Sequence, residues 1–459
     1  MALRVLATNV SGYAWPLEAW ERGLEWGPDV ISAQGTTLDD GAYLLGASEM
    51  YTRGGRLGFD RAADLVLGAA HKLRIPAIFS AGDSGHDVGL EGALRVIDDV
   101  TRRRDMQLRL GVISGELSKK YLLEKLDAGV RMPRLVDHPA LPPELTAEDV
   151  ESCTHIVAQM GPEPIMRALE GGVDGVVTGR ALDEAVHMAI PLMRGIGRGL
   201  ACHMAKIAET AQSGGTWRAP HLIEVEEGHF TIKPADATTR CTTTSVASVA
   251  FYERPDPRSI AYPGGTLNLA GARYRQVDDV SVEVSGASWS DAPYTVKLEG
   301  ARLVGRRFLG IAGVRDPAMV AGIHFVLEAV EEAMAKVRTD FAGTAPFRHS
   351  LRVFGLNAVL QDAEPIRDTL GHELGIVVDV VSSDEDVGRV ACYRALHTLL
   401  MCDYPGRKST SGNVAWSMSP EVIEAGDAYE FAIHHLLPLD DPLEPFSSST
   451  VIFPRKGAA

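Results

Sequence analysis

The sequence predicts an α/β protein in which an N-terminal, doubly wound and mostly parallel sheet is followed by an α+β C-terminal domain. Over residues 1–220, short apolar β-branched segments alternate with helical segments, which is typical of a parallel sheet covered by helices on both faces. Over residues 221–459, strands and turns dominate at first, and strand–helix pairs follow. The 459 residues suffice for two or three domains, at roughly 100–200 residues per domain.

Six short apolar segments of the first half are expected to form parallel strands. A helix over Phe59–Leu73 is indicated by apolar residues at helical spacing. A second helix, over Pro162–Glu170, begins with an early proline and ends at two glycines. Six strands favour an open sheet, because a barrel of this type needs eight. The expected strands are Arg4–Asn9, Asp29–Gln34, Ile75–Ser80, Leu108–Ser114, His155–Gln159 and Gly175–Thr178.

The second half is expected to begin after the loop-forming segment Gln212–Pro220, which contains a Gly-Gly pair and ends in proline. The segment Leu222–Val304 has alternating apolar and polar residues between turn residues, which indicates short strands. Three strand–helix pairs are then expected. They are Leu303–Ile311 with Asp316–Val337, Leu351–Gly355 with Ile366–Leu374, and Ile376–Val381 with Asp384–Met401.

Composition excludes several classes of protein. The 45 Lys and Arg residues against 61 Asp and Glu give a net charge of −16, and both halves are acidic, so no nucleic-acid partner is expected. No apolar stretch reaches the roughly 18 residues of a membrane span, and the N-terminus lacks a signal-peptide layout. We therefore expect a cytoplasmic protein without a membrane partner. The 5 cysteines are scattered without a C-x-x-C pair, which favours buried thiols over disulfides or structural zinc.

Nucleotide cofactors are not indicated. The glycines at 195, 197 and 199 do not form a G-x-G-x-x-G motif and do not directly follow a strand, and the chain has no Walker lysine motif. NAD and ATP are therefore disfavoured, and no cofactor is expected to be required.

The loops after the expected strands predict a ligand crevice. Ligands of open parallel sheets bind at the carboxyl ends of the strands, because the loops diverge there and helix amino termini present free amides. In this chain those loops are polar and rich in glycine, although such residues also suit turns and caps. Arg180 is expected to hold a carboxylate through its guanidinium, and Asp183 to cap the following helix rather than orient Arg180. The other candidates for substrate or anion binding are Thr178, Gly179, Gly82, Ser84, Gly35, Thr36 and Asn9.

The sharpest candidate for catalysis is the series His203, Lys206 and Glu209, spaced at i, i+3 and i+6. On a helix, His203 and Lys206 share a face and Glu209 lies at its edge, one turn further on. The series is either a proton-transfer group with tuned pKa values or a surface Lys and Glu near a hydrogen-bonded histidine. The flanking residues are apolar, so the helix is expected to be partly buried, and a buried lysine needs a partner.

Asp83 and His86 are further candidates for catalysis, in a loop that also contains Asp87. Carboxylates and imidazole are suitable ligands for a divalent cation, and a metal-dependent hydrolase would follow from such a site. Three ligands in one loop are weak evidence, however, and no metal is expected.

Five sequence motifs occur in one order along nearly the whole chain. They are Val173–Asp183, His203–Gly215, Ile232–Pro234 with the threonines that follow, Tyr294–Lys297, and Gly412–Pro420 continuing through Tyr429–His434 to Asp441 and Pro442. In this order the motifs resemble the acyclic terpene utilisation (AtuA-like) family. The resemblance is most specific over residues 174–215 and 412–441.

The resemblance implies a catabolic enzyme of branched acyclic acids and their coenzyme A thioesters. Together with the paired titratable groups, it predicts a lyase or hydratase, because elimination of water needs a base for the α-proton and an acid for the leaving hydroxyl. Lys206, Glu209 or His203 would move the proton next to the carbonyl. Coenzyme A would enter only as part of the substrate, and a homo-oligomer is expected.

The sequence departs from the family pattern in two places. Glu209 and Ser213–Gly215 stand where the family has Glu-Cys and Thr-Gly-Gly, so the pattern assigns no role to Glu209. The chain also ends soon after Pro442 without the small extra domain of some relatives, which leaves room for a separate small subunit. Two other functions stay open: a non-catalytic ligand-binding or assembly subunit of a catabolic complex, and the metal-dependent hydrolase based on Asp83 and His86.

Overall fold

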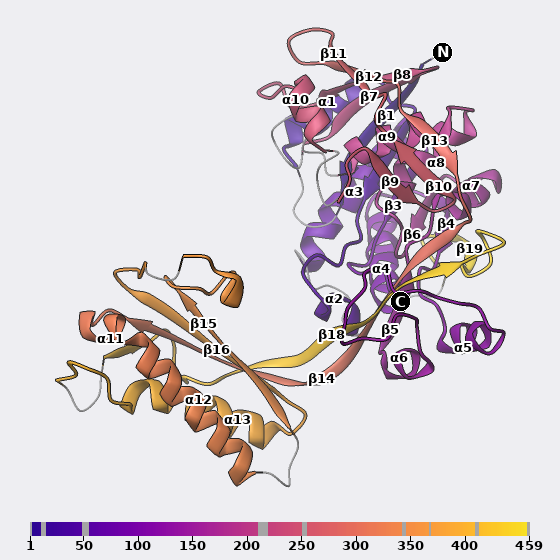
Figure 1. The fold of residues 1–459 in the computed structure, drawn as a ribbon. Helices are drawn as coiled ribbons and strands as arrows, with labels where there is room; N and C mark the ends of the chain where they lie inside the picture. Colours follow the sequence, from indigo (N-terminus) through magenta and orange to yellow (C-terminus); the bar gives the residue numbers. More distant parts are fainter. Residues whose placement is uncertain are drawn as a thin grey trace. The chain divides into compact units, whose positions relative to one another are not determined.

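The computed structural model describes residues 2–10, 15–47, 55–209, 219–249, 255–341, 346–366, 369–408 and 413–456. The chain divides into two compact units (Figure 1). Unit 1 comprises Met1–Arg302 and Phe431–Ala459, and unit 2 comprises Leu303–Glu430. The sequence places the boundary at residue 220 instead, in a segment of which 212–218 lie outside the described residues. The difference arises because the strand that begins at His221 pairs with the first strand of unit 1.

Within the described residues, unit 1 is built on a ten-stranded sheet in the order β11-β12-β8-β7-β1-β2-β3-β6-β4-β19. The adjacent strands from β1 to β4 in this order are parallel. They are β1 (Leu3–Asn9), β2 (Val30–Gln34), β3 (Ala77–Ser80), β6 (Gly175–Thr178) and β4 (Leu108–Ile113). The flanking strands pair antiparallel. They are β7 (His221–Glu226), β8 (His229–Pro234), β12 (Val282–Ser285), β11 (Arg273–Gln276) and β19 (Ser448–Phe453).

Helices cover both faces of the parallel strands, which confirms the predicted fold class. Successive residues of a strand point to opposite faces, and Val5 and Leu6 of β1 accordingly belong to different apolar cores. The Leu6 core contains α1 (Leu17–Glu25), α3 (Gly55–Leu73) and α4 (Asp87–Arg103). The Val5 core contains α7 (Pro162–Glu170), α8 (Ala185–Met193) and α9 (Arg198–Ala208).

The expected sixth parallel strand is not part of this sheet. β5 (His155–Ala158) pairs antiparallel with β14 (Thr295–Val314), with Ala158 opposite Leu298. The prediction of six parallel strands is therefore wrong by one strand. The reason is physical: a short apolar run fits any buried sheet position, and its periodicity does not specify its partner. The chain reaches β5 after α5 (Lys119–Asp127) and α6 (Ala147–Ser152).

A small second sheet of unit 1 covers α9. It consists of β9 (Ser259–Tyr262), β10 (Gly265–Asn268) and β13 (Ser288–Asp291), paired antiparallel. Both β10 and β13 contact α9, so this helix is enclosed between the two sheets and its residues from Gly199 to Ala208 are buried. The remaining short helices of the unit are α2 (Tyr43–Gly46) and α10 (Thr243–Ser248).

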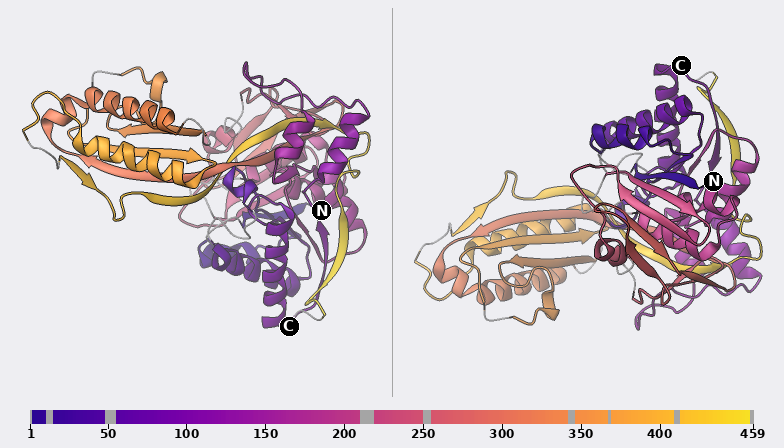
Figure 2. Two further views of the ribbon diagram at one scale, coloured as in Figure 1. Left: turned by 90° about the horizontal axis from the view of Figure 1, so that it is seen from below. Right: turned by 90° about the horizontal axis from the view of Figure 1, so that it is seen from above.

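Unit 2 is a two-layer α+β structure. Its sheet contains β14 from Arg306 onward, together with strands that pair with it or with one another. Helices α12 and α13 lie side by side on this sheet in Figures 1 and 2. The strands are β15 (Phe347–Phe354), β16 (Leu374–Ser382), β17 (Val414–Trp416) and β18 (Ile423–Pro438), and the helices are α11 (Pro317–Ala321), α12 (Ile323–Asp340) and α13 (Glu385–Met401).

Two of the three strand–helix pairs expected in this region are confirmed, with α12 and α13 as their helices. The helix expected over Ile366–Leu374 is absent from the described part of that segment, and the short 3-10 turn Gln361–Ala363 lies before it. Gly371 disfavours a helix, and its amide donates instead to the carbonyl of Gly355 at 2.9 Å.

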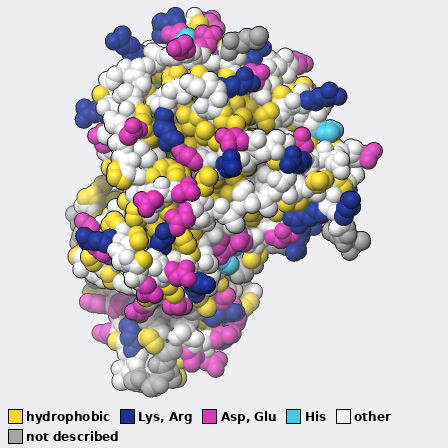
Figure 3. Space-filling model, turned by 90° about the vertical axis from the view of Figure 1, so that its right-hand side faces the viewer, with side chains coloured by type: hydrophobic (Ala, Val, Ile, Leu, Met, Phe, Trp, Pro, Cys, Tyr) yellow, Lys and Arg dark blue, Asp and Glu magenta, His cyan; other side chains and the backbone are white. Residues whose placement is uncertain are grey.

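The surface carries both signs of charge. On the face shown in Figure 3, Lys and Arg side chains are interspersed with Asp and Glu, and hydrophobic side chains lie between them. Ion pairs link neighbouring helices, as between Arg103 of α4 and Asp60 of α3 at 2.9 Å. Exposed pairs of this kind contribute only about 0–1 kcal/mol each, so the two buried apolar cores supply most of the stability of unit 1.

The loops at the carboxyl ends of the parallel strands pack too closely for side chains at several glycines. A Cβ atom at Gly115 would lie 2.3 Å from the amide nitrogen of Arg180. We expect Gly115→Ala to lower the free energy of unfolding by about 1–3 kcal/mol, the usual effect of overpacking, as measured by urea denaturation. Gly313→Ala is the control, because its Cβ would meet no atom closer than 3.8 Å. Equal effects of the two substitutions would contradict this account.

Candidate active site

The loops predicted to border a crevice do meet at the carboxyl ends of the parallel strands. The hydroxyl of Ser80, the last residue of β3, accepts hydrogen bonds from the amides of Gly35 and Thr36 at 2.9 and 3.1 Å. The amide of Arg180 donates to the carbonyl of Gly85 at 3.0 Å. Loops that are far apart in the sequence therefore pack together in one layer. The side chains of this layer make up the candidate site.

The glycines of these loops let backbones pack against one another. A Cβ atom at Gly35 would lie 2.0 Å from the carbonyl oxygen of Ser80, and one at Gly179 would lie 2.4 Å from the carbonyl oxygen of Gly85. Gly82 has φ +92°, a conformation that favours glycine. These contacts explain the glycines structurally, and the expected binding of substrate by Gly35, Gly82 and Gly179 stays a prediction.

Arg180 is buried and is held by acceptors of the protein itself. Its Nε donates to Oε2 of Glu299 at 2.9 Å, while Nη1 donates to the carbonyl of Thr36 at 3.1 Å and to Oδ1 of Asp183 at 3.4 Å. The side chains of Arg180 and Glu299 are only 6% and 7% exposed. The charge of Arg180 is paired and most of its donors are engaged within the protein. Its expected role as a substrate anchor stays a prediction.

Glu299 of β14 is the partner that sequence reasoning missed. Besides Arg180, it accepts hydrogen bonds from Nε2 of Gln159 at 3.0 Å and pairs with Nζ of Lys297 at 3.2 Å. Burial alone would raise the pKa of the Glu299 carboxyl, but Arg180 and Lys297 together hold this pKa at about 2. The motif Tyr294–Lys297 was the nearest signal in the sequence, and it ends two residues before Glu299.

At the end of α9, Lys206 forms an ion pair with Glu209, and both side chains are buried. The Glu209 carboxyl also forms a hydrogen bond with Glu184, whose Oε1 accepts the hydroxyl of Tyr262 at 2.7 Å. Burial and the neighbouring charge of Glu184 raise the pKa of Glu209 well above its ordinary value, with Lys206 acting in the opposite direction. A carboxyl whose pKa is raised in this way holds its proton more readily than an ordinary glutamate does.

Asp183 is the exposed end of what we call the acidic cluster, namely Asp183, Glu184 and Glu209. Its side chain is 38% exposed and accepts from Nε2 of Gln34 at 3.4 Å. Partial removal from solvent raises the pKa of Asp183 to about 6, against the opposing charge of Arg180. The expected capping role is wrong: α8 begins at Ala185 with Glu184 at its N-cap and no side-chain cap, because the Asp183 carboxyl is turned to Arg180 and Gln34.

His203 faces away from these carboxyl groups. Its Nε2 lies 3.1 Å from the hydroxyl of Tyr274, and the rings of Phe230 and Tyr274 stand edge-on to the imidazole. Burial lowers the pKa of His203 to about 4. The imidazole is therefore neutral and surrounded by aromatic side chains, although it shares a helix with Lys206.

Asp83 and His86 have structural partners. His86 is the N-cap of α4, and its Nδ1 accepts the amide of Gly89 at 3.1 Å while its Nε2 lies 3.1 Å from the carbonyl of Ala47. The carbonyl of Asp83 accepts the amide of Thr37 at 2.9 Å. Across the described ranges of the chain, no three His, Cys, Asp or Glu side chains are placed so that they could hold a metal ion.

The remaining predicted residues line the same loops. The hydroxyl of Thr178 donates to the carbonyl of the next residue at 3.0 Å, and the Asn9 amide donates to Gln34. The hydroxyls of Thr36 and Ser84 are buried and have no hydrogen-bond partner within the part of the chain that the structure describes. The binding roles predicted for these four residues are not tested by their positions.

The sequence matches the family described as Acyclic terpene utilisation family protein AtuA over residues 48–194 and 219–428. The chain belongs to this family. No curated protein and no solved structure matches the chain. Among the helices in the described ranges, none combines the length and the apolar character that crossing a membrane requires.

The AtuA match divides the site into two parts. Arg180, Asp183 and Glu184 lie in the first matched segment and Glu299 lies in the second, whereas the whole of α9 falls between them. The local pattern at Glu209 also differs from that of the family, as noted above. The Arg180–Glu299 pair and the two carboxyls that follow Arg180 are therefore the part of the site that belongs to the matched AtuA segments.

A second cluster of titratable side chains lies on the loops of this AtuA protein, and the sequence did not reveal it. Nδ1 of His155 lies 2.7 Å from Oε1 of Glu116, and the His86 and His155 ring centroids are 4.4 Å apart. The other oxygen of Glu116 accepts the amide of Asp87 at 2.8 Å. The sequence identifies His155 only as the start of a strand and does not single out Glu116, because residues 39 positions apart give no local signal.

The Glu299 carboxylate should stabilise unit 1 strongly. Because its folded pKa of about 2 lies below its ordinary value of 4.5, this stability is present above pH 4.5 and is lost as the pH falls toward 2. Glu299→Gln leaves the Arg180 charge buried without its partner. We expect this substitution to reduce the free energy of unfolding at pH 7 by about 3–5 kcal/mol and to remove most of the acid-dependent loss.

Urea denaturation between pH 3 and pH 7 measures both effects. Glu170→Gln provides a matched control in unit 1, because it breaks an exposed ion pair with Arg167 whose side chains are 72% and 53% exposed and which should contribute at most about 1 kcal/mol. A loss of stability no greater in Glu299→Gln than in this control would contradict the assignment.

Proposed function

We propose that this AtuA family member is a catabolic hydro-lyase that acts on a branched acyl substrate by proton transfer next to a carbonyl group. The observation that carries the proposal is the acidic cluster. One of its carboxyls, Asp183, has a pKa of about 6 and is partly accessible, while the pKa of the buried Glu209 beside Glu184 is raised well above its ordinary value. Carboxyls whose environments move their pKa values apart are a common basis for acid and base roles in one site.

In the proposed reaction, the Asp183 carboxylate accepts the proton from the carbon next to the carbonyl. The C–H electron pair first moves toward the carbonyl oxygen to give an enolate. Collapse of the enolate then forms the new C=C bond as the C–O bond to the β-hydroxyl breaks. The Glu184–Glu209 pair donates a proton to the departing oxygen, which leaves as water. Lys206 orients Glu209 through their ion pair, and Arg180 orients Asp183. The reverse sequence would hydrate the double bond.

The charge balance of the site favours a thioester over a free acid at the reacting end of the substrate. Arg180 and Lys297 are paired with Glu299, and Lys206 is paired with Glu209. A free carboxylate next to the acidic cluster would meet like charge, whereas a thioester carbonyl is neutral. A coenzyme A thioester of a branched acid therefore fits the cluster better than the acid itself.

Asp183→Asn tests the base. We expect kcat/KM to fall by about 10²–10⁴, and we expect the wild-type activity to decline as the pH falls below about 6, where Asp183 becomes protonated. The assay follows the absorbance of the conjugated thioester with branched 3-hydroxyacyl-CoA substrates between pH 4.5 and 8. Asp183→Glu retains a carboxylate and should retain part of the activity and the acid limb. A folded Asp183→Asn protein with wild-type activity would refute the role.

Glu209→Gln tests the proton donor. The amide keeps the shape and the hydrogen-bonding capacity of the side chain but cannot supply the proton, so we expect kcat to fall by about 10² or more while the circular dichroism spectrum is unchanged. Exchange of the substrate α-proton with deuterated solvent should persist, because Asp183 is intact. Loss of exchange together with turnover would indicate that Glu209 does not act separately from Asp183.

A further inference from the structure

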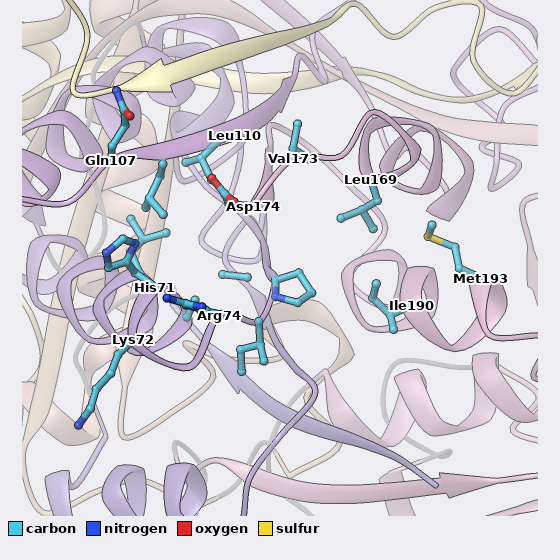
Figure 4. Close-up of a pocket in the computed structure, with 16 residues that line it drawn as sticks. His71, Lys72, Arg74, Gln107, Leu110, Leu169, Val173, Asp174, Ile190 and Met193 are labelled. Carbon is cyan, nitrogen blue, oxygen red and sulfur yellow. The ribbon is translucent and has the colours of Figure 1, made fainter. Parts of the chain in front are cut away.

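A cavity of about 840 Å³ lies at the opposite edge of the sheet from the acidic cluster. It opens at the amino ends of the parallel strands, where Ala77 begins β3, Leu108 begins β4 and Asp174 precedes β6. Helix ends from both faces of the sheet complete its wall, as the close-up in Figure 4 shows. Ligand sites for small molecules typically have volumes of about 300–1,000 Å³, so this cavity has room for one.

The wall of this cavity is predominantly apolar on one side. Leu110, Leu169, Val173, Ile190 and Met193 all line it. In Figure 4, Leu169, Ile190 and Met193 lie together on one side, and Leu110 lies nearer to Gln107. Burying an apolar chain against such a wall is favourable at about 25 cal/mol per Å² of apolar surface. The body of a ligand in this cavity would therefore be hydrocarbon.

The other side of the cavity carries Arg74. In Figure 4 its guanidinium lies beside His71, at the cavity, while the amino group of Lys72 points away. Within the described chain, the Arg74 side chain makes no hydrogen bond or ion pair. The nearby Asp174 carboxylate accepts the backbone amide of Arg109 at 2.7 Å and, among the described residues, forms no ion pair with Arg74.

The backbone at Arg74 is unusual for an arginine. Arg74 follows the last turn of α3 with φ 56°, in the left-handed region where helices commonly end on glycine. The amide of Ile75 donates to the carbonyl of Ala70 at 3.1 Å and closes the helix. Glycine would serve this turn with less strain, so the local fold does not account for the arginine. A role for its side chain at the cavity does.

We propose that this cavity binds a small amphipathic carboxylate, with its hydrocarbon chain against the apolar wall and its carboxylate on Arg74. One guanidinium matches a carboxylate through two parallel hydrogen bonds, whereas a phosphate group with its higher charge would call for additional cations. The site is separate from the acidic cluster and requires no chemical step.

Isothermal titration of the full-length protein with decanoate, and with 1-decanol for comparison, tests the proposal. Wild-type protein should bind one decanoate. Arg74→Gly should weaken decanoate binding about tenfold or more and leave 1-decanol binding unchanged, since it removes only the charged contact. Glycine readily adopts the positive φ found at position 74, so the Arg74→Gly protein should fold. The matched control is Asp105→Gly. It also replaces a residue of positive φ by glycine just after a helix, here α4 with φ 50° at Asp105, and it should leave decanoate binding unchanged.

Two further variants locate the ligand. Val173→Trp fills the cavity and should abolish binding of both probes. Asp183→Asn should bind decanoate as the wild type does, which also separates this proposal from the proposed reaction. The proposal is overturned if wild-type protein does not bind decanoate, if Arg74→Gly binds it with unchanged affinity, or if Asp183→Asn abolishes its binding.

Discussion

The buried ion pair between Arg180 and Glu299 is the interaction on which the arrangement of the site depends. It joins Arg180, the second residue after β6, to a residue of β14 that lies 119 positions further along the chain. Taking two charges out of water is costly, and the cost is recovered only where geometry and additional hydrogen bonds are good. Here the extra bonds come from Gln159 and Thr36. The same guanidinium then reaches Asp183, so one pair sets both the local fold and the charge of the site.

Three carboxyl groups of unit 1 show how burial and charge compete. All three are removed from water to some degree, which by itself raises their pKa values. Cations around Glu299 more than reverse this effect, Arg180 reverses it only partly at Asp183, and at Glu209 the adjacent Glu184 adds to it. Carboxyl groups in one unit thus titrate differently because of their neighbours. That difference is the basis of the acceptor and donor roles proposed for the acidic cluster.

The predictions that succeeded depend on local patterns. Apolar periodicity located the parallel strands and most helices, and the apolar flanks of Lys206 indicated its burial. Pairings between distant segments could not be predicted in this way. The partner of β5 is β14, the partner of Arg180 is Glu299, and the tertiary neighbour of Glu209 is Glu184, which sequence analysis had passed over beside Asp183. A single sequence contains the residues of such pairs but not their distance, so their electrostatics followed only from the fold.

Unit 2 is inserted between two strands of unit 1 that adjoin each other. Strands β14 and β18 are paired. The chain leaves unit 1 after Arg302 and re-enters it at Phe431. Two residues inside each of these points, a Cβ at Gly300 would lie 2.9 Å from the Cβ of Ile433. A tight turn between these strands would close unit 1 into an uninterrupted chain without rerouting any other segment. Evolution could therefore exchange or lose the insert as a unit while unit 1 keeps its own topology.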